Sequence, residues 1–331
     1  MSRCSSTPLA IVIAPILICV LASVVLALEF GYAESYGPEQ WGECSGRHHS
    51  PLTIDLVNAV EKNFTELEII NFNVVPRTFE MSNNGHTVLV KMSFNKETVP
   101  TVKGGPLAEK TPLGYQFEQF HFYWGDNETF INKDVAINQA YLFELHLVLR
   151  NSEYPNLTIA MEKDHGIAVM AFYFHIGLVP ARGYTDFTDL LAQIDRKGQT
   201  VNMNYPLPLG EYISKYLDNY FSYSDSLTIP PCSVEATWLY FPYTIDISEE
   251  QFNVFHRLTA SDDHLKNDFP PSEPFNVGTL YKNKETRNDS YSVPLVNVAN
   301  AAEKWMPHLM GALLYFCVLV PLLRTSDFSG F

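Results

Sequence analysis

Short runs of β-branched and aromatic residues, separated by turn-forming residues, occupy most of the chain. Such residues are enriched in strands, and in a strand successive side chains point to opposite faces of the sheet. Turn signals such as Asn84-Gly85 and Pro230-Pro231 separate the runs. We therefore expect strands at 86–92, 115–124, 141–150, 166–177 and 236–241.

Helical spacing of apolar residues is confined to two segments, 187–199 and 248–260. No internal repeat is visible. The pattern predicts a single, mainly β domain over residues 28–282, followed by a polar, Asn- and Ser-rich stalk at 283–304.

The start of the chain has the features of a signal peptide. An apolar stretch from about Leu9 to Leu28 follows Arg3, and small residues favour cleavage after Ala27, so 1–27 is the expected signal. An uncleaved signal anchor is the alternative.

The other end of the chain carries a second apolar segment, 305–323, before a short tail at 324–331. As a helix its 19 residues would reach roughly 28 Å, which matches the hydrocarbon core of a bilayer. A lipid-anchor signal is the alternative, because small residues around Asn300-Ala301-Ala302 precede a spacer and an apolar tail. With either anchor, we expect the domain on the extracellular face of the plasma membrane, tethered to it by the C-terminal segment.

The cysteines and the sequons fit a secretory route. Apart from Cys4, Cys19 and Cys317 in the terminal segments, Cys44 and Cys232 remain in the domain, and in an oxidising compartment they predict one disulfide. The four N-x-S/T sequons, which predict glycosylation, are at Asn63, Asn127, Asn156 and Asn288.

Charge and size narrow the possible partners. The chain has 331 residues, 46% of them hydrophobic and 13% aromatic, enough for a sizeable core. Its formal charge of −15, with no Lys/Arg run, argues against nucleic acid and anionic glycans as partners.

Two predicted strands carry the candidate chemistry. Gln119, His121 and Tyr123 share one face of the first strand, and Glu144 and His146 share a face of the second. If the strands are neighbours, the histidines meet, and Gln119 and Glu144 can accept the other imidazole N–H, as groups behind metal ligands do. Taken alone, two strand histidines are more often ordinary buried residues.

A series of short motifs runs along the chain: FGYAESYGPEQW (30–41), SPLTID (50–55), NNGH (83–86), KGGPL (103–107), QFHFYWG (119–125), ELHLV (144–148), SLTIPP (226–231) and TW (237–238). Their order and spacing resemble those of the α-carbonic anhydrases over roughly 250 residues, the length of a domain. The positions of Cys44 and Cys232 match the disulfide of the family's extracellular, membrane-bound branch. The resemblance implies a mainly β (α+β) fold with a large, mostly antiparallel, twisted central sheet and short peripheral helices.

In that family three histidines hold Zn²⁺, which lowers the pKa of a bound water that attacks CO₂. The resemblance places the first and third ligands at His121 and His146, and the second at Tyr123. It places His86 at the proton-shuttle position, where an imidazole of near-neutral pKa is suited to the task. A surface turn histidine is the alternative for His86.

Two further positions depart from the family pattern. Thr228 falls where a threonine orients the zinc-bound hydroxide, but Lys133 stands at the position of the glutamate that accepts the threonine proton. Ile229 replaces a residue that is usually small and polar. The positions that match the hydrophobic CO₂ wall are Val148, Val169, Leu227 and Trp238.

Tyrosine differs from histidine as a ligand because its phenol, with an ordinary pKa near 10, must first lose a proton. Two histidines should hold zinc far more weakly than three, so we expect the family's Zn²⁺ to be weakly bound or absent. The leading interpretation is a membrane-tethered carbonic-anhydrase-like protein with little or no CO₂ hydratase activity, serving to bind an unidentified protein partner. The alternatives are an active zinc enzyme that interconverts CO₂ and bicarbonate, and a purely structural or storage protein.

Overall fold

The computed structural model describes most of the predicted domain. The described ranges are 52–53, 58–125, 132–134, 139–141, 143–227, 235–258, 273–274 and 279–284, and the side chains of 52–53, 132–134, 139–141 and 273–274 are not described. Several predictions therefore lie outside the described residues: the signal 1–27, Cys44, Cys232, Asn127, Thr228, Ile229, Asn288, most of the stalk 283–304, the segment 305–323, the tail 324–331 and the side chain of Lys133.

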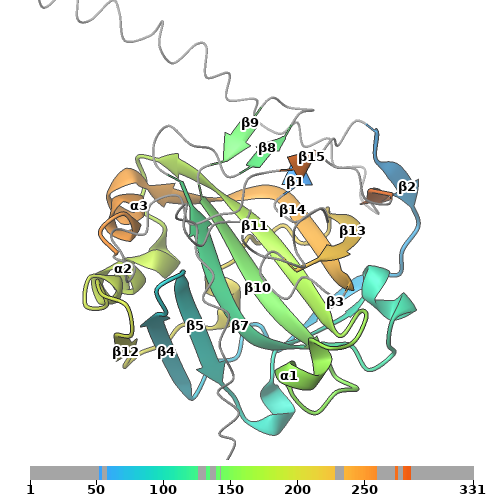
Figure 1. Cartoon of the computed structure of the whole chain (residues 1–331), viewed down its shortest axis with the longest axis horizontal. Coiled ribbons are helices and arrows are strands. Elements are labelled where there is room, and N and C mark those ends of the chain that lie inside the picture. Colours follow the sequence, from blue (N-terminus) through green and yellow to red (C-terminus); the bar gives the residue numbers. More distant parts are fainter. Residues whose placement is uncertain are drawn as a thin grey trace, which may run out of the picture.

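A twisted sheet of twelve strands forms the centre of the molecule (Figure 1). Its order is β12-β4-β5-β7-β10-β11-β14-β13-β16-β2, and β3 joins through β6, which pairs with β7. The strands are β2 (Val60–Lys62), β3 (Leu67–Ile70), β4 (Thr78–Asn83), β5 (Val88–Ser93), β6 (Thr101–Gly104), β7 (Tyr115–Trp124), β10 (Phe143–Asn151), β11 (Ile167–Gly177), β12 (Thr200–Asn202), β13 (Phe221–Ser226), β14 (Glu235–Ser248) and β16 (Tyr281–Asn283).

Most pairs in this sheet are antiparallel; its described parallel pairs are β11–β14 and β16–β2. Two short pairs lie apart from it, β1 (Leu52–Thr53) with β15 (Glu273–Pro274) and β8 (Asn132–Asp134) with β9 (Gln139–Tyr141). The described α-helices are short, α1 (Leu157–Ala160), α2 (Thr185–Leu191) and α3 (Glu249–Phe255). The predicted fold class is thus confirmed. Within the described ranges, none of the helices has both the length and the apolar character needed to span a bilayer.

Both predicted helices are shorter than the periodicity suggested. The segment 187–199 is helical only to Leu191, because the chain then turns through Gly198, at φ 84°, and enters β12, which pairs with β4. In the other segment, Ser248 caps α3 through a reciprocal bond pair with Gln251. The helix ends at Phe255, where bonds between residues three apart replace the helical ones: Arg257 N–H donates to the Val254 carbonyl and Leu258 N–H to the Phe255 carbonyl.

The two faces of the sheet bury different cores. On one face, aromatic rings of β7 pack against α2 and α3; the Phe122 ring lies 5.5 Å from Phe187 and 5.2 Å from Phe255. A smaller cluster on the other face includes Val148, Val169 and Trp238. Side chains alternate along β7. One face of the strand therefore carries Gln119, His121 and Tyr123, and the opposite face carries the neighbouring phenylalanines.

Candidate functional site

The two histidines face each other across the central strands. β7 and β10 are antiparallel neighbours, and their register sets His146 opposite His121, Glu144 opposite Tyr123 and Val148 opposite Gln119. The two imidazole ring centroids are 5.5 Å apart. The sequence thus places two nitrogen-bearing rings at one spot on the sheet.

Tyr123 fills the space beside them. Its side chain is only 3% exposed, and its ring centroid lies 4.8 Å from that of His146 and 5.3 Å from that of His121. The three rings therefore form one packed group at the base of the site.

A buried carboxylate supports one of the histidines. His146 Nε2 lies 2.6 Å from Glu144 Oε1, and the two residues are 1% and 2% exposed. Glu144 Oε2 is buried without a hydrogen-bond partner. The bond fixes the His146 ring, and Nδ1 is then its remaining nitrogen. Among the described side chains no hydrogen bond joins Gln119 to His121, so the accepting role of Gln119 stays a prediction.

Desolvation of its ring, and secondarily the neighbouring His146, lowers the pKa of His121 to about 3. The His121 imidazole is therefore uncharged at neutral pH, with a proton on one ring nitrogen and a free lone pair on the other.

A pocket of about 60 Å³ opens above the histidines. Gln119, His121 and His146 line it together with the four predicted wall residues, Val148, Val169, Leu227 and Trp238. The structure adds three apolar residues that the sequence analysis missed, Leu157, Met161 and Ile167. Leu157 and Met161 are four residues apart, but α1 is only four residues long, so the sequence shows no repeated helical period there.

Of the predicted shuttle and hydroxide-orienting residues, His86 has a described side chain, Lys133 has only a described backbone, and Thr228 lies outside the described residues. His86 lies on the turn between β4 and β5, where its backbone N–H donates to Asn84 Oδ1, and it is not part of the pocket lining. Lys133 lies on β8, paired with Ala140. The roles of His86, Lys133 and Thr228 stay predictions.

The described residues do not fit a three-histidine zinc site. Within these ranges no group of three or more His, Cys, Asp or Glu residues is arranged to hold a metal ion. The donors at the site are the imidazoles of His121 and His146, with a phenol ring beside them.

An unexpected carboxyl group, Asp225, is buried on the same face of the sheet. Asp225 is 4% exposed; its Oδ1 accepts the Ser226 N–H at 2.8 Å, and its Oδ2 is buried without a partner. Burial, and secondarily the charge of Glu235, raises its pKa to about 7. Its neighbour Ser226 accepts the Trp238 indole N–H at 3.2 Å, which links Asp225 to the pocket wall.

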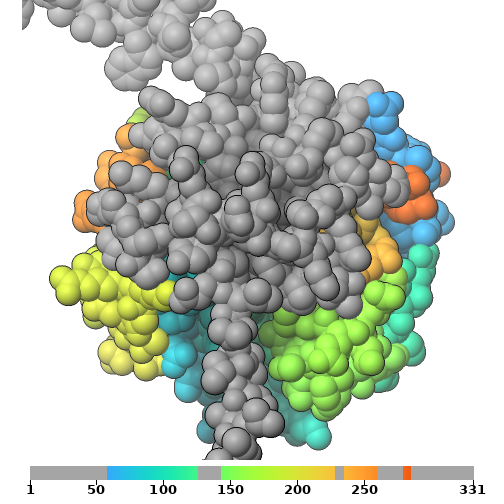
Figure 2. Space-filling view, in the orientation of Figure 1, coloured from blue at the N-terminus to red at the C-terminus, as the bar shows by residue number. Residues whose placement is uncertain are grey.

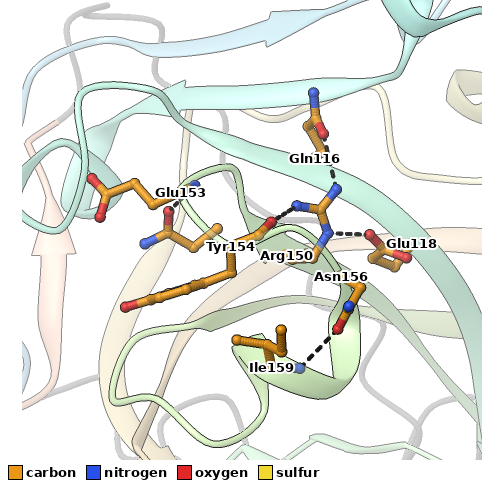
Figure 3. Close-up of polar contacts among 8 residues, drawn as sticks. Gln116, Glu118, Arg150, Glu153, Tyr154, Asn156 and Ile159 are labelled. Atoms are coloured by element: carbon orange, nitrogen blue, oxygen red, sulfur yellow. Dashed lines mark hydrogen bonds and ion pairs between the residues drawn. The ribbon is translucent and has the colours of Figure 1, made fainter.

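An arginine holds the segment that carries the missed wall residues (Figure 3). Arg150 Nε donates to Glu118 Oε1 at 2.5 Å, its second terminal nitrogen donates to Gln116 Oε1 at 3.0 Å, and its first donates to the Tyr154 carbonyl. Glu118 stands where the β7–β10 register shifts, as a bulge residue does. The wall formed by α1 is thus tied directly to the central strands.

Known proteins are similar in sequence to this chain over most of its length. The family model for eukaryotic-type carbonic anhydrase matches residues 35–284. A carbonic anhydrase-related protein of Homo sapiens is 30% identical over 251 residues, covering 70% of this chain and 82% of that protein, and one of Rattus norvegicus gives the same figures. Carbonic anhydrase 6 of Homo sapiens is 26% identical over 258 residues, covering 76% of this chain and 80% of that protein.

Proposed function

The chain belongs to the eukaryotic-type carbonic anhydrase family, and we propose that it is a member with little or no CO₂ hydratase activity. The observation that carries this proposal is Tyr123, whose buried ring packs against His121 and His146 where the family has its second zinc-binding histidine.

Zinc affinity depends on the number and geometry of the ligands. Here two imidazoles remain, and a phenol must lose a proton before it binds a cation well. A tyrosine ring is also larger than an imidazole, and the buried Tyr123 ring takes up the space beside both histidines. We infer that the site holds zinc poorly.

The departures at Lys133 and Ile229 point the same way. A cation at the family's glutamate position cannot accept the proton of Thr228, and it adds a charge that opposes a second cation nearby. Three departures among the residues that act on CO₂ fit a site no longer constrained by catalysis.

The function that we propose in place of catalysis is binding to a protein partner, by a domain held at the extracellular face of the membrane. The net charge of −15 supports this in so far as it disfavours nucleic acid and anionic glycans. The disulfide predicted between Cys44 and Cys232 and the glycosylation predicted at the four sequons are both typical of that compartment.

A weakly active zinc enzyme is the second candidate, favoured by the parts of the site that remain. The Glu144–His146 hydrogen bond and the four apolar wall residues are in place, so a phenolate from Tyr123 or a water could complete the donor set. Tyr123→Phe separates the two donors, because it removes only the hydroxyl.

Stopped-flow CO₂ hydration by the purified protein tests the proposed function. We expect a rate indistinguishable from buffer, with human carbonic anhydrase 6 as the positive control. Hydration above the buffer rate would instead support the second candidate. Its loss in Tyr123→Phe would then indicate a phenolate donor, and its retention a water.

Removing residues 305–331 should release the glycosylated domain into the culture medium, because the predicted membrane attachment is confined to that segment. A bacterial phosphatidylinositol-specific phospholipase then distinguishes the two anchors on intact cells. Release by the phospholipase indicates a lipid anchor; retention indicates a transmembrane helix. A truncated chain that stays with the membrane would contradict C-terminal tethering.

A further inference from the structure

Asn156 adjoins a segment that lines the pocket. It is exposed and immediately precedes Leu157, which lines the pocket. Leu157 and Met161 are among the half-buried lining residues, together with Gln119, His121 and Leu227, whereas Val169 and Trp238 are buried at 2% and 1% exposure. In Figure 2 the green atoms around α1 belong to the molecular surface. The N-terminal end of α1 is therefore near the pocket mouth.

The Asn156 amide has one atom engaged and one atom free. Its Oδ1 accepts the Ile159 N–H at 2.9 Å and so caps α1 (Figure 3). Among the described residues its Nδ2 has no hydrogen-bond partner. Thr158, which completes the Asn156-Leu157-Thr158 sequon, is exposed as well. The capping bond thus fixes the amide while leaving its nitrogen accessible.

We propose that Asn156 carries an N-linked glycan that stands over the pocket mouth and limits the size of the molecules that enter. The inference rests on the extracellular location in the proposed function. In the linkage, Nδ2 loses one proton and bonds to the anomeric carbon of an oligosaccharide, whose bond to a lipid pyrophosphate carrier breaks. Oδ1 takes no part, so the cap of α1 survives the modification.

The length of α1 sets how far the glycan must reach. Asn156 and Met161 are five residues apart, roughly 7 Å along a helix axis. An oligosaccharide of several sugars is longer than this, so it can cover both Leu157 and Met161. The Arg150 bonds that tie this segment to the sheet keep the attachment point fixed relative to the pocket.

The chain contains a matched control site. In the Asn63-Phe64-Thr65 sequon, just after β2, Asn63 and Thr65 are exposed, and none of the three residues lines the pocket. Removing a glycan there should leave pocket access unchanged.

The test uses the full chain secreted by cells that glycosylate, and compares Thr158→Ala, Thr65→Ala and Asn156→Asp. Peptide mass spectrometry gives the occupancy of each sequon and the rate at which tert-butyl hydroperoxide oxidises Met161. We expect Thr158→Ala to speed Met161 oxidation several-fold and Thr65→Ala to leave it unchanged. Asn156→Asp removes the glycan but keeps a capping oxygen, so it should match Thr158→Ala and exclude loosening of α1 as the cause.

Each other outcome overturns the proposal in a different way. An unmodified Asn156 beside a glycosylated Asn63 shows that the site is wrong while the secretory route stands. Two unmodified sequons contradict the extracellular part of the proposed function as well. A glycosylated Asn156 with equal Met161 oxidation in wild type and Thr158→Ala shows that the glycan does not cover the mouth.

Discussion

Replacing Tyr123 with histidine is expected to raise the affinity for Zn²⁺ by more than about 100-fold, since loss of even a group that orients a ligand costs 10–100-fold. The substitution restores three imidazoles on one face, because residue 123 lies opposite Glu144 and two positions from His121 on an unbroken strand. Glu144 already holds the His146 ring through Nε2. Equilibrium dialysis against a zinc-buffered solution measures the change.

Tyr123→Phe is the control for this substitution. It also changes the ring but supplies no nitrogen, so its zinc affinity should stay at or below that of the wild type. Equal affinities for the histidine and phenylalanine variants would show that residue 123 does not face the metal position.

Catalysis should return only in part in the single variant, because the resemblance predicts Lys133 at the position from which a glutamate orients Thr228 in the family. Removing such an orienting group typically costs on the order of 10²–10³ in rate. The double variant Tyr123→His, Lys133→Glu should exceed the single one in CO₂ hydration by a similar factor. Equal rates would mean that Lys133 is not at that position.

The second large effect concerns stability, and Asp225→Asn is expected to raise the free energy of unfolding above pH 7 by up to about 4 kcal/mol. The pKa of Asp225 is raised from 3.8 to about 7 in the folded protein, so the unfolded chain loses its proton first. The stability that the protonated carboxyl contributes is complete below about pH 4 and is lost as the pH rises towards 7. Asparagine keeps the Oδ1 that accepts the Ser226 N–H and carries no charge.

Urea unfolding of wild type and Asp225→Asn at pH 4 and pH 8 checks this expectation. The difference between the two proteins should appear at pH 8 and nearly vanish at pH 4. Glu235→Gln is the matched control and should give a smaller gain, because that charge is the secondary cause of the shift. A difference of the same size at both pH values would mean that ionisation of Asp225 is not its source.

The strands that the sequence predicted well are those with strong apolar character. The 115–124 prediction matches β7, and 166–177 matches β11 to within one residue, because both are dense in aromatic or aliphatic residues. By contrast, β14 was predicted only to residue 241, since Pro242 interrupts the run; the strand continues past it with a shift in register. The strand β13, which carries Asp225, was missed because its sequence FSYSDS is largely polar.

The candidate site was accessible to sequence reasoning where it lies on regular strands. Period-two alternation set the face of the strand on which His121 and His146 each lie, and the structure supplies the β7–β10 pairing that brings the two histidines together. The sequence did not predict the part of the wall formed by Leu157 and Met161, because a four-residue helix gives no detectable period of apolar residues. Nor does sequence show that the Asp225 carboxyl is buried without a partner for Oδ2, which depends on distant packing.

The most direct test of the central claim is the zinc content of the wild-type protein. Protein purified without chelators and dialysed against buffer containing micromolar zinc is analysed by inductively coupled plasma mass spectrometry, beside Tyr123→His treated identically. The account predicts far less than one zinc per wild-type chain and close to one per Tyr123→His chain. One tightly held zinc per wild-type chain would contradict it and make Tyr123 a competent part of the metal site.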